Sequence, residues 1–557
     1  MKFGDMPYKR ITYEEIEQRF RGLIDELKAA ESCDGAMAAV RGLYELQSDM
    51  TPMELCYERY NMNVNDEFYS AEQEYYGEIG PRITELYNEF DRLLIGSQFR
   101  GELEGILGEQ ALIMMENGQR SFDSRLVPLL REESALTERY NKVTSNLTAD
   151  WRGEKIRPSM MAADLASKDR ETRRLAALAV SKAWEEKRGE IEDIYQGLVE
   201  NRDRQAKALG MKSYSELSCC LMNRIGYGLK EIAEFRERVK KHIVPLSELV
   251  SERRRERLGL DKLRFYDNIC FAEGDPMPLG GTEYCLEKTR EMYHAMSGET
   301  AEFIDFMLDN DLCDTDIRDG KRGGGYMAFL EKYRAPFIFA NFDGTSENAY
   351  IMCHEGGHAF QAYLKRDEEI RHKAQYTSES AETHAMAMEC FAAPYMELFF
   401  GERAEDYRRM HLEGAVRLIV NECLQDEFQQ RVYDDPDMSC EERNALWARL
   451  SKEYFPSSDH SGNENLERGC GWQRIQHNFF WPFYTVDYAL AQVCALEYYR
   501  WADEDRSAAW SSYLDFCRST GNDSFPKLAK AAGLDDPFAE ETLKGLADWI
   551  GKRLEVR

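Results

Sequence analysis

The chain has 557 residues, a formal net charge of -30, and hydrophobic and charged fractions of 43% and 31%. This balance is typical of a soluble globular protein, and the negative charge argues against nucleic acid and anionic membranes as partners, because both attract basic patches. No apolar run approaches the roughly 20 residues that cross a bilayer. The first ten residues also lack the apolar core of a signal peptide. We therefore expect a cytoplasmic protein whose 14 scattered cysteines are reduced.

The N-terminal third is predicted to be helical. Thr12 to Glu15 has the capping-box pattern, and the apolar residues that follow recur at helical spacing. The pair Gly80-Pro81 is expected to break one helix, because proline removes a backbone donor. Aromatic residues stripe these helices and are expected to pack in the core. The further helices expected in this third span residues 37–47, 53–60, 66–94, 100–117 and 134–145.

The middle of the chain combines helices with loops and a strand. Residues 155–165 are expected to hold a short strand. The triple glycine Gly323 to Gly325 suits a turn whose backbone approaches another group closely. Ala335 to Phe342 is predicted to be a strand. The helices expected in this part span residues 168–189 with a continuation over 190–209, then 229–258 and 283–296.

The stretch Ala349 to Phe360 contains an H-E-x-x-H motif. On a helix, His354 and His358 lie on one face, one turn apart, so both imidazoles can reach one ion. Zinc binds such nitrogens at about 2.0–2.1 Å and needs at least one more protein ligand, which leaves a position for water. Glu355 is placed to act on that water as a general base. Chance predicts about 0.01–0.02 such matches in this chain, so a surface helix with two solvated histidines is the weaker interpretation.

Three further residues of this stretch are expected to serve packing. Gly356 and Gly357 each cost about 1 kcal/mol relative to alanine inside a helix, so a structural reason is needed. The simplest reason is that another backbone, or the substrate, approaches the helix closely at these positions. Cys353 points roughly 100° away from the first histidine and is therefore expected to be a packing residue rather than a nucleophile or ligand.

The third metal ligand is expected downstream, between Ser378 and Glu389. Glu379, Glu382 and Glu389 share one face of the predicted helix, whereas His384 lies on another. We favour Glu382 as the ligand, with Glu389 or Glu379 bracing the ligand histidines. The alternative is that all three are ordinary exposed acids.

Residues that bind the substrate are expected in two places. The strand before the helix with the H-E-x-x-H motif, called the zinc helix below, is well placed to pair with an extended peptide across the metal. Ala340 and Gly325 are therefore candidates for substrate binding. The alternative is that this strand only forms the core of a sheet. The aromatic run from Trp472 to Ala489 carries His477, Tyr484 and Tyr488. Such runs more often belong to a core. A zinc peptidase, however, needs donors for the oxyanion, and histidine and tyrosine can supply them.

At these residues the chain resembles the thimet oligopeptidase and oligoendopeptidase F family of zinc peptidases, more closely the oligoendopeptidase F branch. The match rests on Pro336 to Thr345, His354 to His358, Ala381-Glu382 and His477 to Ala489, in a specific order and spacing. It covers roughly residues 155 to 545. The resemblance implies a mostly α-helical fold, in which two helical lobes enclose a deep channel with the metal on its floor and a small β-sheet beside the zinc helix.

The resemblance also implies a metal centre and its base. Carried over by position, His354, His358 and Glu382 correspond to the ligands of one Zn²⁺ per chain, and Glu355 to the general base. The chain departs from the family at Gly356, where the branch usually has a bulky residue. This departure leaves the chemistry intact and bears on local packing and on cleavage-site preference.

The resemblance also implies substrate-binding roles for residues of the aromatic run. His477 and Tyr488 correspond to residues that bind the substrate and stabilise the tetrahedral oxyanion, with Tyr484 a weaker candidate. The function implied is a zinc-dependent oligoendopeptidase that cuts internal bonds of short unstructured peptides. On this basis we expect an N-terminal helical lobe over residues 1–200 and a catalytic region over residues 201–557.

Two other functions stay open at this point. A zinc metallocarboxypeptidase of similar helical build also carries H-E-x-x-H and would release single C-terminal residues. A non-catalytic peptide-binding protein with a relic site is the second, and the intact ligand and base residues count against it. A helical scaffold without metal leaves the glycine-rich and aromatic blocks unexplained. The sequence does not set the oligomeric state, and Mn²⁺ or Co²⁺ could substitute for zinc.

Overall fold

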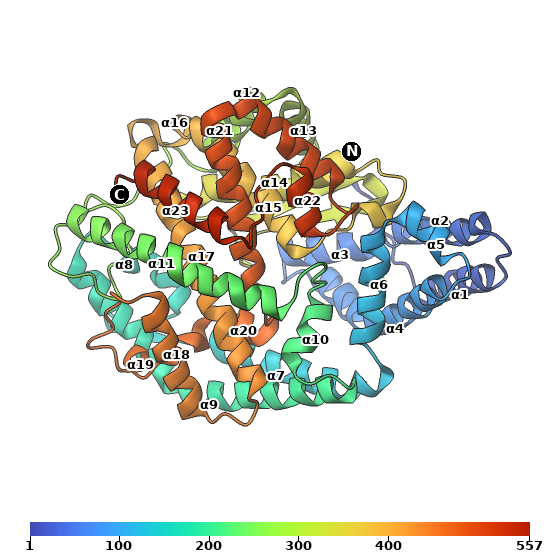
Figure 1. Cartoon of the computed structure of the whole chain (residues 1–557), viewed down its shortest axis with the longest axis horizontal. Coiled ribbons are helices and arrows are strands. Elements are labelled where there is room, and N and C mark those ends of the chain that lie inside the picture. Colours follow the sequence, from blue (N-terminus) through green and yellow to red (C-terminus); the bar gives the residue numbers. More distant parts are fainter. Residues whose placement is uncertain (557) are drawn as a thin grey trace. The chain divides into compact units, whose positions relative to one another are not determined.

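The structure is a computed structural model that describes residues 1–556. It is mostly helical (Figure 1), which confirms the predicted mostly α-helical fold class, and it contains two small sheets. The first sheet pairs β1 (Ala149–Trp151) with β2 (Glu154–Ile156) in antiparallel fashion. The second has three strands in the order β3-β5-β4. These are β3 (Cys313–Asp316), β5 (Ala335–Phe342) and β4 (Tyr326–Leu330).

The chain forms two compact units, each assembled from three segments. The first unit comprises residues 1–119, 276–405 and 498–534, and the second comprises residues 120–275, 406–497 and 535–557. Residue 200 lies inside α9 (Arg170–Ala208), a single helix of the second unit. The functional division expected near that residue stays a prediction.

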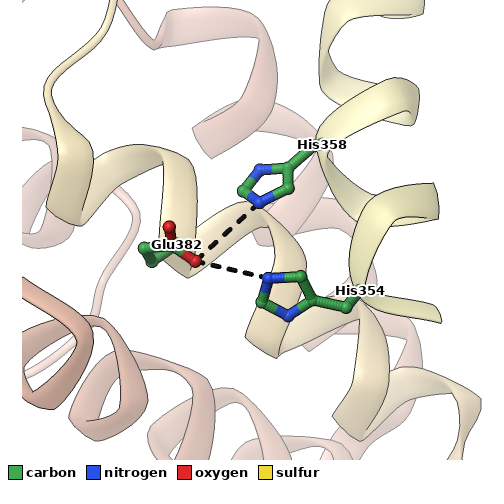
Figure 2. Close-up of side chains that lie close together, drawn as sticks. All are labelled: His354, His358 and Glu382. Atoms are coloured by element: carbon green, nitrogen blue, oxygen red, sulfur yellow. Dashed lines mark ion pairs between the residues drawn. The ribbon is translucent and has the colours of Figure 1, made fainter. Parts of the chain in front are cut away.

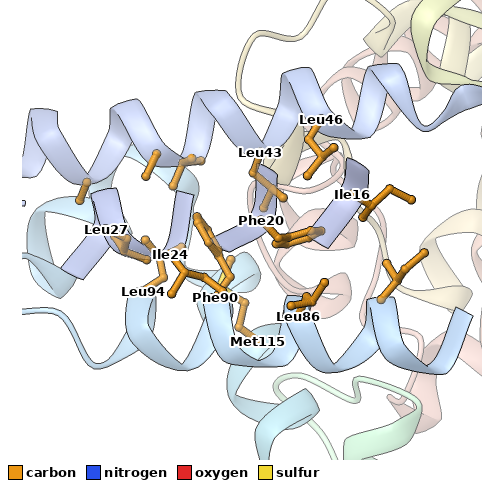
Figure 3. Packing of buried hydrophobic residues seen from close by; sticks show 14 of the residues in the cluster. Ile16, Phe20, Ile24, Leu27, Leu43, Leu46, Leu86, Phe90, Leu94 and Met115 are labelled. Carbon is orange, nitrogen blue, oxygen red and sulfur yellow. The ribbon is translucent and has the colours of Figure 1, made fainter. Parts of the chain in front are cut away.

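The first unit contains the N-terminal helices, whose apolar faces form one core. Thr12 caps α1 with the predicted capping box. Side chains such as Phe20 of α1, Leu43 of α2 and Phe90 of α4 interlock in this core (Figure 3) and are 2% exposed or less. The helices wholly or mainly in this unit are α1 (Tyr13–Lys28), α2 (Cys33–Asp49), α3 (Thr51–Met62), α4 (Glu67–Ile95), α5 (Arg100–Leu107), α6 (Glu109–Ser121), α12 (Thr282–Met296), α13 (Gly298–Asp309), α14 (Glu347–Lys365), α15 (Ser378–Ala392), α16 (Glu397–Phe400) and α22 (Phe525–Ala531).

Two helix boundaries in this unit differ from the prediction. Pro81 does not break α4, which continues through it. Ile79 and Ile83 are buried on either side of the proline, and this packing offsets the roughly 3 kcal/mol that a proline costs inside a helix. Residues 100–117 form two helices instead of one, because Gly108 adopts a φ of 96° between α5 and α6. Only glycine adopts that backbone conformation readily.

The second unit is built around α9 and α17. The strand expected within residues 155–165 reaches only Ile156, in β2. Helix α21 begins in this unit and continues into the first. The helices wholly or mainly in this unit, apart from α21, are α7 (Val127–Ser145), α8 (Ala162–Leu165), α9, α10 (Tyr214–Leu221), α11 (Leu229–Arg257), α17 (Ala404–Asp434), α18 (Cys440–Tyr454), α19 (Glu464–Glu467), α20 (His477–Phe480) and α23 (Glu540–Arg553), and α21 spans Thr485–Ser519.

Strand β5 is the centre of its sheet. It runs parallel to β3, with Cys313 opposite Ile338, and antiparallel to β4, with Met327 opposite the same residue. The expectation that β5 itself pairs with a peptide is therefore wrong for residues 335–339, because β4 occupies one hydrogen-bonding edge of this stretch and β3 pairs with the other edge from Ile338 onward. Strand β4 lies at an edge of the sheet. The chain turns from β5 directly into α14, which packs on β5 and on α15.

No helix within residues 1–556 has the length and apolarity needed to cross a membrane. The expected cytoplasmic location stays a prediction. All 14 cysteines are free in the structure, and their reduced state stays a prediction. Cys353 is buried, and burial raises the pKa of its thiol, which makes it a poor nucleophile.

Candidate metal centre

Helix α14 brings the two motif histidines to one side, facing α15. Its start is fixed by Asn348, whose Oδ1 accepts hydrogen bonds from the backbone N–H groups of Asp343 (3.0 Å) and Gly344 (3.3 Å). Figure 2 shows His354 and His358 pointing from α14 toward Glu382 on α15. Their Nε2 atoms lie 3.4 and 3.8 Å from Glu382 Oε2.

The three side chains fit a metal ion in number, chemistry and spacing. Their ligand atoms all lie within 4.8 Å of one another, and within residues 1–556 no other group of three such residues does the same. Two imidazole nitrogens and a carboxylate oxygen form a donor set that zinc accepts, and three protein ligands leave a fourth position open. The two histidines of the H-E-x-x-H motif and Glu382, which lie on two different helices, are therefore close together in the structure.

A second carboxylate supports the first histidine. Glu389 Oε1 lies 2.7 Å from His354 Nδ1, and the ring of Tyr350 stacks on the imidazole at 5.5 Å. A hydrogen bond at Nδ1 fixes the tautomer that keeps Nε2 available as a ligand. Glu389, one of the two bracing acids expected from the sequence, thus contacts a motif histidine.

The two histidines differ in their charge environment. Burial alone would lower the pKa of His354, but hydrogen bonds with Glu382 and Glu389 raise it well above its usual value. Burial lowers the pKa of His358 to about 4. His358 is therefore neutral, the state in which an imidazole binds a metal.

Gly357 allows α14 and α15 to approach closely. A Cβ at this position would lie 2.6 Å from Ala385 Cα and 2.6 Å from the carbonyl oxygen of His384, both backbone atoms of α15. No residue larger than glycine fits there without moving one helix. The close backbone approach expected from the sequence is confirmed at Gly357, and it sets the distance between the histidines and Glu382.

Gly356 has a different neighbour. A Cβ there would lie 2.1 Å from the hydroxyl oxygen of Tyr293 on α12. That hydroxyl is buried and donates a hydrogen bond of 3.0 Å to the carbonyl oxygen of Met352. The tyrosine hydroxyl thus fills the space beside Gly356, which gives the glycine at this position a packing explanation.

Glu355 lies beside the glycine-rich loop that precedes β4. The residue is 8% exposed, and burial raises the pKa of its carboxyl group to about 7. A Cβ on Gly325 would lie 3.7 Å from Glu355 Oε1 and 3.6 Å from the carbonyl oxygen of Phe339. The glycine loop therefore runs directly past the predicted general base.

Lys321 and Asn341 hold this loop against β5, and the sequence reasoning assigned neither a role. Lys321 Nζ donates to the carbonyl oxygen of Ala340 at 2.6 Å and lies 3.2 Å from Asp314 of β3. Asn341 Nδ2 donates to the carbonyl oxygen of Gly324 at 2.8 Å. Ala340 is fully buried, so only its backbone could serve a substrate. The run of glycines was the one sequence signal that pointed to this region.

The aromatic candidates lie in the second unit and pack on one another. The His477 ring stacks on that of Tyr484 at 5.8 Å. The ring of Tyr488 lies 5.1 Å from Tyr484 and 6.2 Å from His477. All three are partly exposed, whereas Phe479 and Phe483 of the same run are buried. The run therefore contributes both to the core and to a surface, and Tyr488 lies in the first turn of α21 rather than in a loop.

The turn before α21 is strained. Phe483 has a φ of 69°, a left-handed conformation that is unfavourable for a large side chain. Its backbone is held by two buried partners: its N–H donates to Gln429 Oε1, and its carbonyl oxygen accepts from Arg224 Nη2 at 2.5 Å. Strain of this kind collects at functional sites, where surrounding contacts maintain it. Here it fixes the direction in which Tyr484 leaves the core.

Comparison with known families and proteins extends these observations to nearly the whole chain. The family model described as the peptidase M3 N-terminal domain matches residues 3–122, and that of peptidase family M3 matches residues 164–274 and 287–548. The second match includes the metal-centre residues and the aromatic cluster.

Individual relatives agree with the family match. Group B oligopeptidase PepB of Streptococcus agalactiae serotype III (strain NEM316) is 24% identical over 326 residues, which are 56% of this chain and 52% of that protein. Oligopeptidase PepF of Bacillus subtilis (strain 168) is 23% identical over 382 residues, 67% of this chain and 55% of that protein. The chain thus spans about half the length of these curated relatives.

Solved structures match over nearly their whole length. PZ peptidase A with inhibitor 2 is 35% identical and has a TM-score of 0.94, with coverage of 100% of this chain and 99% of that one. Oligoendopeptidase-F from Enterococcus faecium, at 16% identity, a TM-score of 0.62 and coverage of 98% and 99%, shares the fold. The resemblance noted in the sequence is therefore confirmed. The motif, the fold and the family models together show that this chain belongs to peptidase family M3.

Proposed function

We propose that this chain is a zinc-dependent oligoendopeptidase that hydrolyses internal bonds of short unstructured peptides. The observation that carries the proposal is the convergence of His354, His358 and Glu382, whose ligand atoms lie within 4.8 Å of one another. Under this proposal the three residues hold one Zn²⁺ per chain. Membership of peptidase family M3 supports the reaction class, and the names of the relatives, oligopeptidase and oligoendopeptidase, support the substrate class.

The proton transfers are assigned to Glu355. When bound, the zinc ion supplies Lewis acidity: it lowers the pKa of water and polarises the scissile carbonyl. Glu355 takes a proton from the attacking water and later delivers it to the departing amine. Gly325 of the glycine loop lies next to this carboxylate, since a Cβ there would be in van der Waals contact with Oε1 at 3.7 Å.

Stabilisation of the oxyanion is assigned to hydrogen-bond donors of the aromatic cluster, His477, Tyr484 and Tyr488. The Tyr488 hydroxyl group and a ring N–H of His477 donate hydrogen bonds to the oxygen that becomes negative in the transition state. Tyr484 packs against both rings and is assigned a supporting substrate-binding role. The strained turn at Phe483 supports this assignment, because it presents these rings at the surface at a cost in backbone energy.

The binding site for the substrate's backbone is assigned to the edge of the three-stranded sheet. Strand β4 lies at that edge and follows the glycine loop, so an extended peptide can add to it as a further strand. Gly325 and Ala340 then contribute through the backbone, Gly325 at the start of β4 and Ala340 by supporting the loop through Lys321. This arrangement favours unfolded substrates, because a folded protein does not offer an unpaired strand.

The test compares wild type with Glu355→Gln on one internally quenched peptide that is blocked at both ends. Zinc content is measured on both preparations, and Mn²⁺ and Co²⁺ are tested as replacements. We expect the wild type to cleave the peptide and the variant, with equal zinc, to be inactive. Loss of zinc in the variant would mean that Glu355 is structural. Failure of the zinc-loaded wild type to cut blocked peptides, together with release of single residues from free-ended ones, would favour a carboxypeptidase. Binding without cleavage of either would favour a peptide-binding protein.

A further inference from the structure

The second unit contains a cavity of about 690 Å³ whose polar groups the peptidase reaction does not use. It is bordered by α11, α17 and α18 and by residues 263–268 and 455–460. Cavities of about 300–1,000 Å³ are typical of small-molecule sites. Its walls combine partly exposed apolar side chains, Phe265 and Leu418, with several charged groups.

The carboxylates that line this cavity are all engaged by neighbouring donors. Each of the four accepts at least one short hydrogen bond from the protein. These bonds join Glu248 to Ser457 N (3.0 Å), Asp267 to Arg170 Nη2 (2.8 Å), Glu422 to Asn421 Nδ2 (3.0 Å) and Asp459 to Arg264 Nη1 (2.6 Å).

Two arginines that line the cavity have no such partner. Among residues 1–556, neither Arg254 of α11 nor Arg417 of α17 has an ion pair or a side-chain hydrogen bond, and Arg254 Nε is buried without a partner. Glu413, whose charge acts on Arg417, is held by Arg257 through two hydrogen bonds of 2.9 and 2.8 Å. Arg417 is exposed as a residue, yet partial desolvation of its guanidinium, together with the charge of Arg254, lowers its pKa to about 10.

The buried Nε of Arg254 lacks an acceptor, and the positive charge of Arg417 lies close to it, which is unfavourable for the isolated chain. Like charges repel, and a buried N–H without an acceptor costs about 1–3 kcal/mol. The chain has 102 acidic residues, so an acid of its own could readily have occupied this position. An anion from solution would satisfy both groups, because the guanidinium fork matches carboxylate and phosphate oxygens in pairs.

We propose that this cavity is a binding site for a small organic anion, whose carboxylate or phosphate group lies between Arg254 and Arg417 and whose apolar part lies against Phe265 and Leu418. The site is separate from the residues assigned to hydrolysis. The same chemistry is offered by a phosphate ester and by the C-terminal carboxylate of a peptide product.

Calorimetric titration of the zinc-loaded protein with two probes distinguishes these sources. Phenyl phosphate represents the phosphate ester, and N-acetylphenylalanine represents the peptide C-terminus. We expect saturable binding of at least one probe at one site per chain, weakened by added salt. Arg254→Gln and Arg417→Gln should each weaken it about tenfold or more, because each removes a charged hydrogen-bond donor. Tighter binding of phenyl phosphate would identify the ligand as a phosphate ester, and tighter binding of the amino acid as a carboxylate.

Two further variants separate recognition from general effects of charge and folding. Arg449→Gln removes one positive charge from an exposed position of α18, with a side chain 66% exposed, and should bind like the wild type. Leu418→Trp narrows the cavity, keeps both charges and should also abolish binding. The proposal is overturned if neither probe binds, or if binding survives in both Arg254→Gln and Arg417→Gln. It is also overturned if the arginine variants bind more weakly only to the extent that Arg449→Gln does.

Discussion

Replacing Gly357 with alanine tests whether the approach of α14 to α15 sets the metal centre. The new Cβ would lie 2.6 Å from Ala385 Cα and 2.6 Å from the His384 carbonyl oxygen. Non-bonded heavy atoms are most stable at about 3.5–4.0 Å. The two helices must therefore separate by about 1 Å, since both contacts are with backbone atoms that cannot rotate away.

This displacement should affect metal binding more than stability. Overpacking costs about 1–3 kcal/mol, whereas the gain in helix propensity from glycine to alanine returns about 1 kcal/mol. The free energy of unfolding should thus fall by no more than about 2 kcal/mol. Metal–ligand distances tolerate only about 0.2 Å. A shift of Glu382 by several times that amount should lower zinc affinity more than tenfold.

The assay is a zinc titration against a competing chelator, combined with thermal unfolding of the metal-free protein. Gly77→Ala on α4 is the matched control, because a Cβ there meets no atom within 4 Å. This control should raise stability by up to about 1 kcal/mol and leave zinc affinity unchanged. If Gly357→Ala binds zinc as tightly as the wild type, the close approach of the helices does not set the ligand geometry and the reasoning fails.

The remaining predictions concern single side chains. Glu389→Gln should weaken zinc binding about 10–100-fold in the same chelator titration, because it removes the carboxylate that orients His354; unchanged affinity would argue against that role. Tyr488→Phe should lower kcat about 10²–10³-fold with little change in KM, and an unchanged kcat would remove it from the oxyanion site. Burial lowers the pKa of His372 from 6.5 to about 4, so the unfolded chain binds this proton more readily than the folded chain. The stability due to neutral His372 is present above pH 6.5 and is lost as pH falls toward 4. His372→Phe should therefore reduce the pH dependence of unfolding in this window by up to about 3 kcal/mol, and parallel profiles for variant and wild type would contradict this.

Local patterns were enough to predict much of the helical fold. The capping box at Thr12 and the apolar spacing after it act within one helix, so they are readable without tertiary contacts. The strand at residues 335–342 was likewise predicted with the bounds that the structure has. The predicted break at Pro81 failed for the converse reason. The proline rule is local, whereas the burial of Ile79 and Ile83 that outweighs it depends on other helices.

The metal centre shows the same division at a finer scale. The sequence by itself determined that His354 and His358 share a face, because that follows from helical periodicity alone. It also narrowed the third ligand to a few acids on one helix. Only the tertiary structure decided that Glu382 meets both histidines, that Glu389 contacts His354, and that β4 rather than β5 lies at the sheet edge. These outcomes depend on how α15 packs against α14 at Gly357 and on the order of the strands in the sheet. Both are set by contacts between segments far apart in the chain, which no local period encodes.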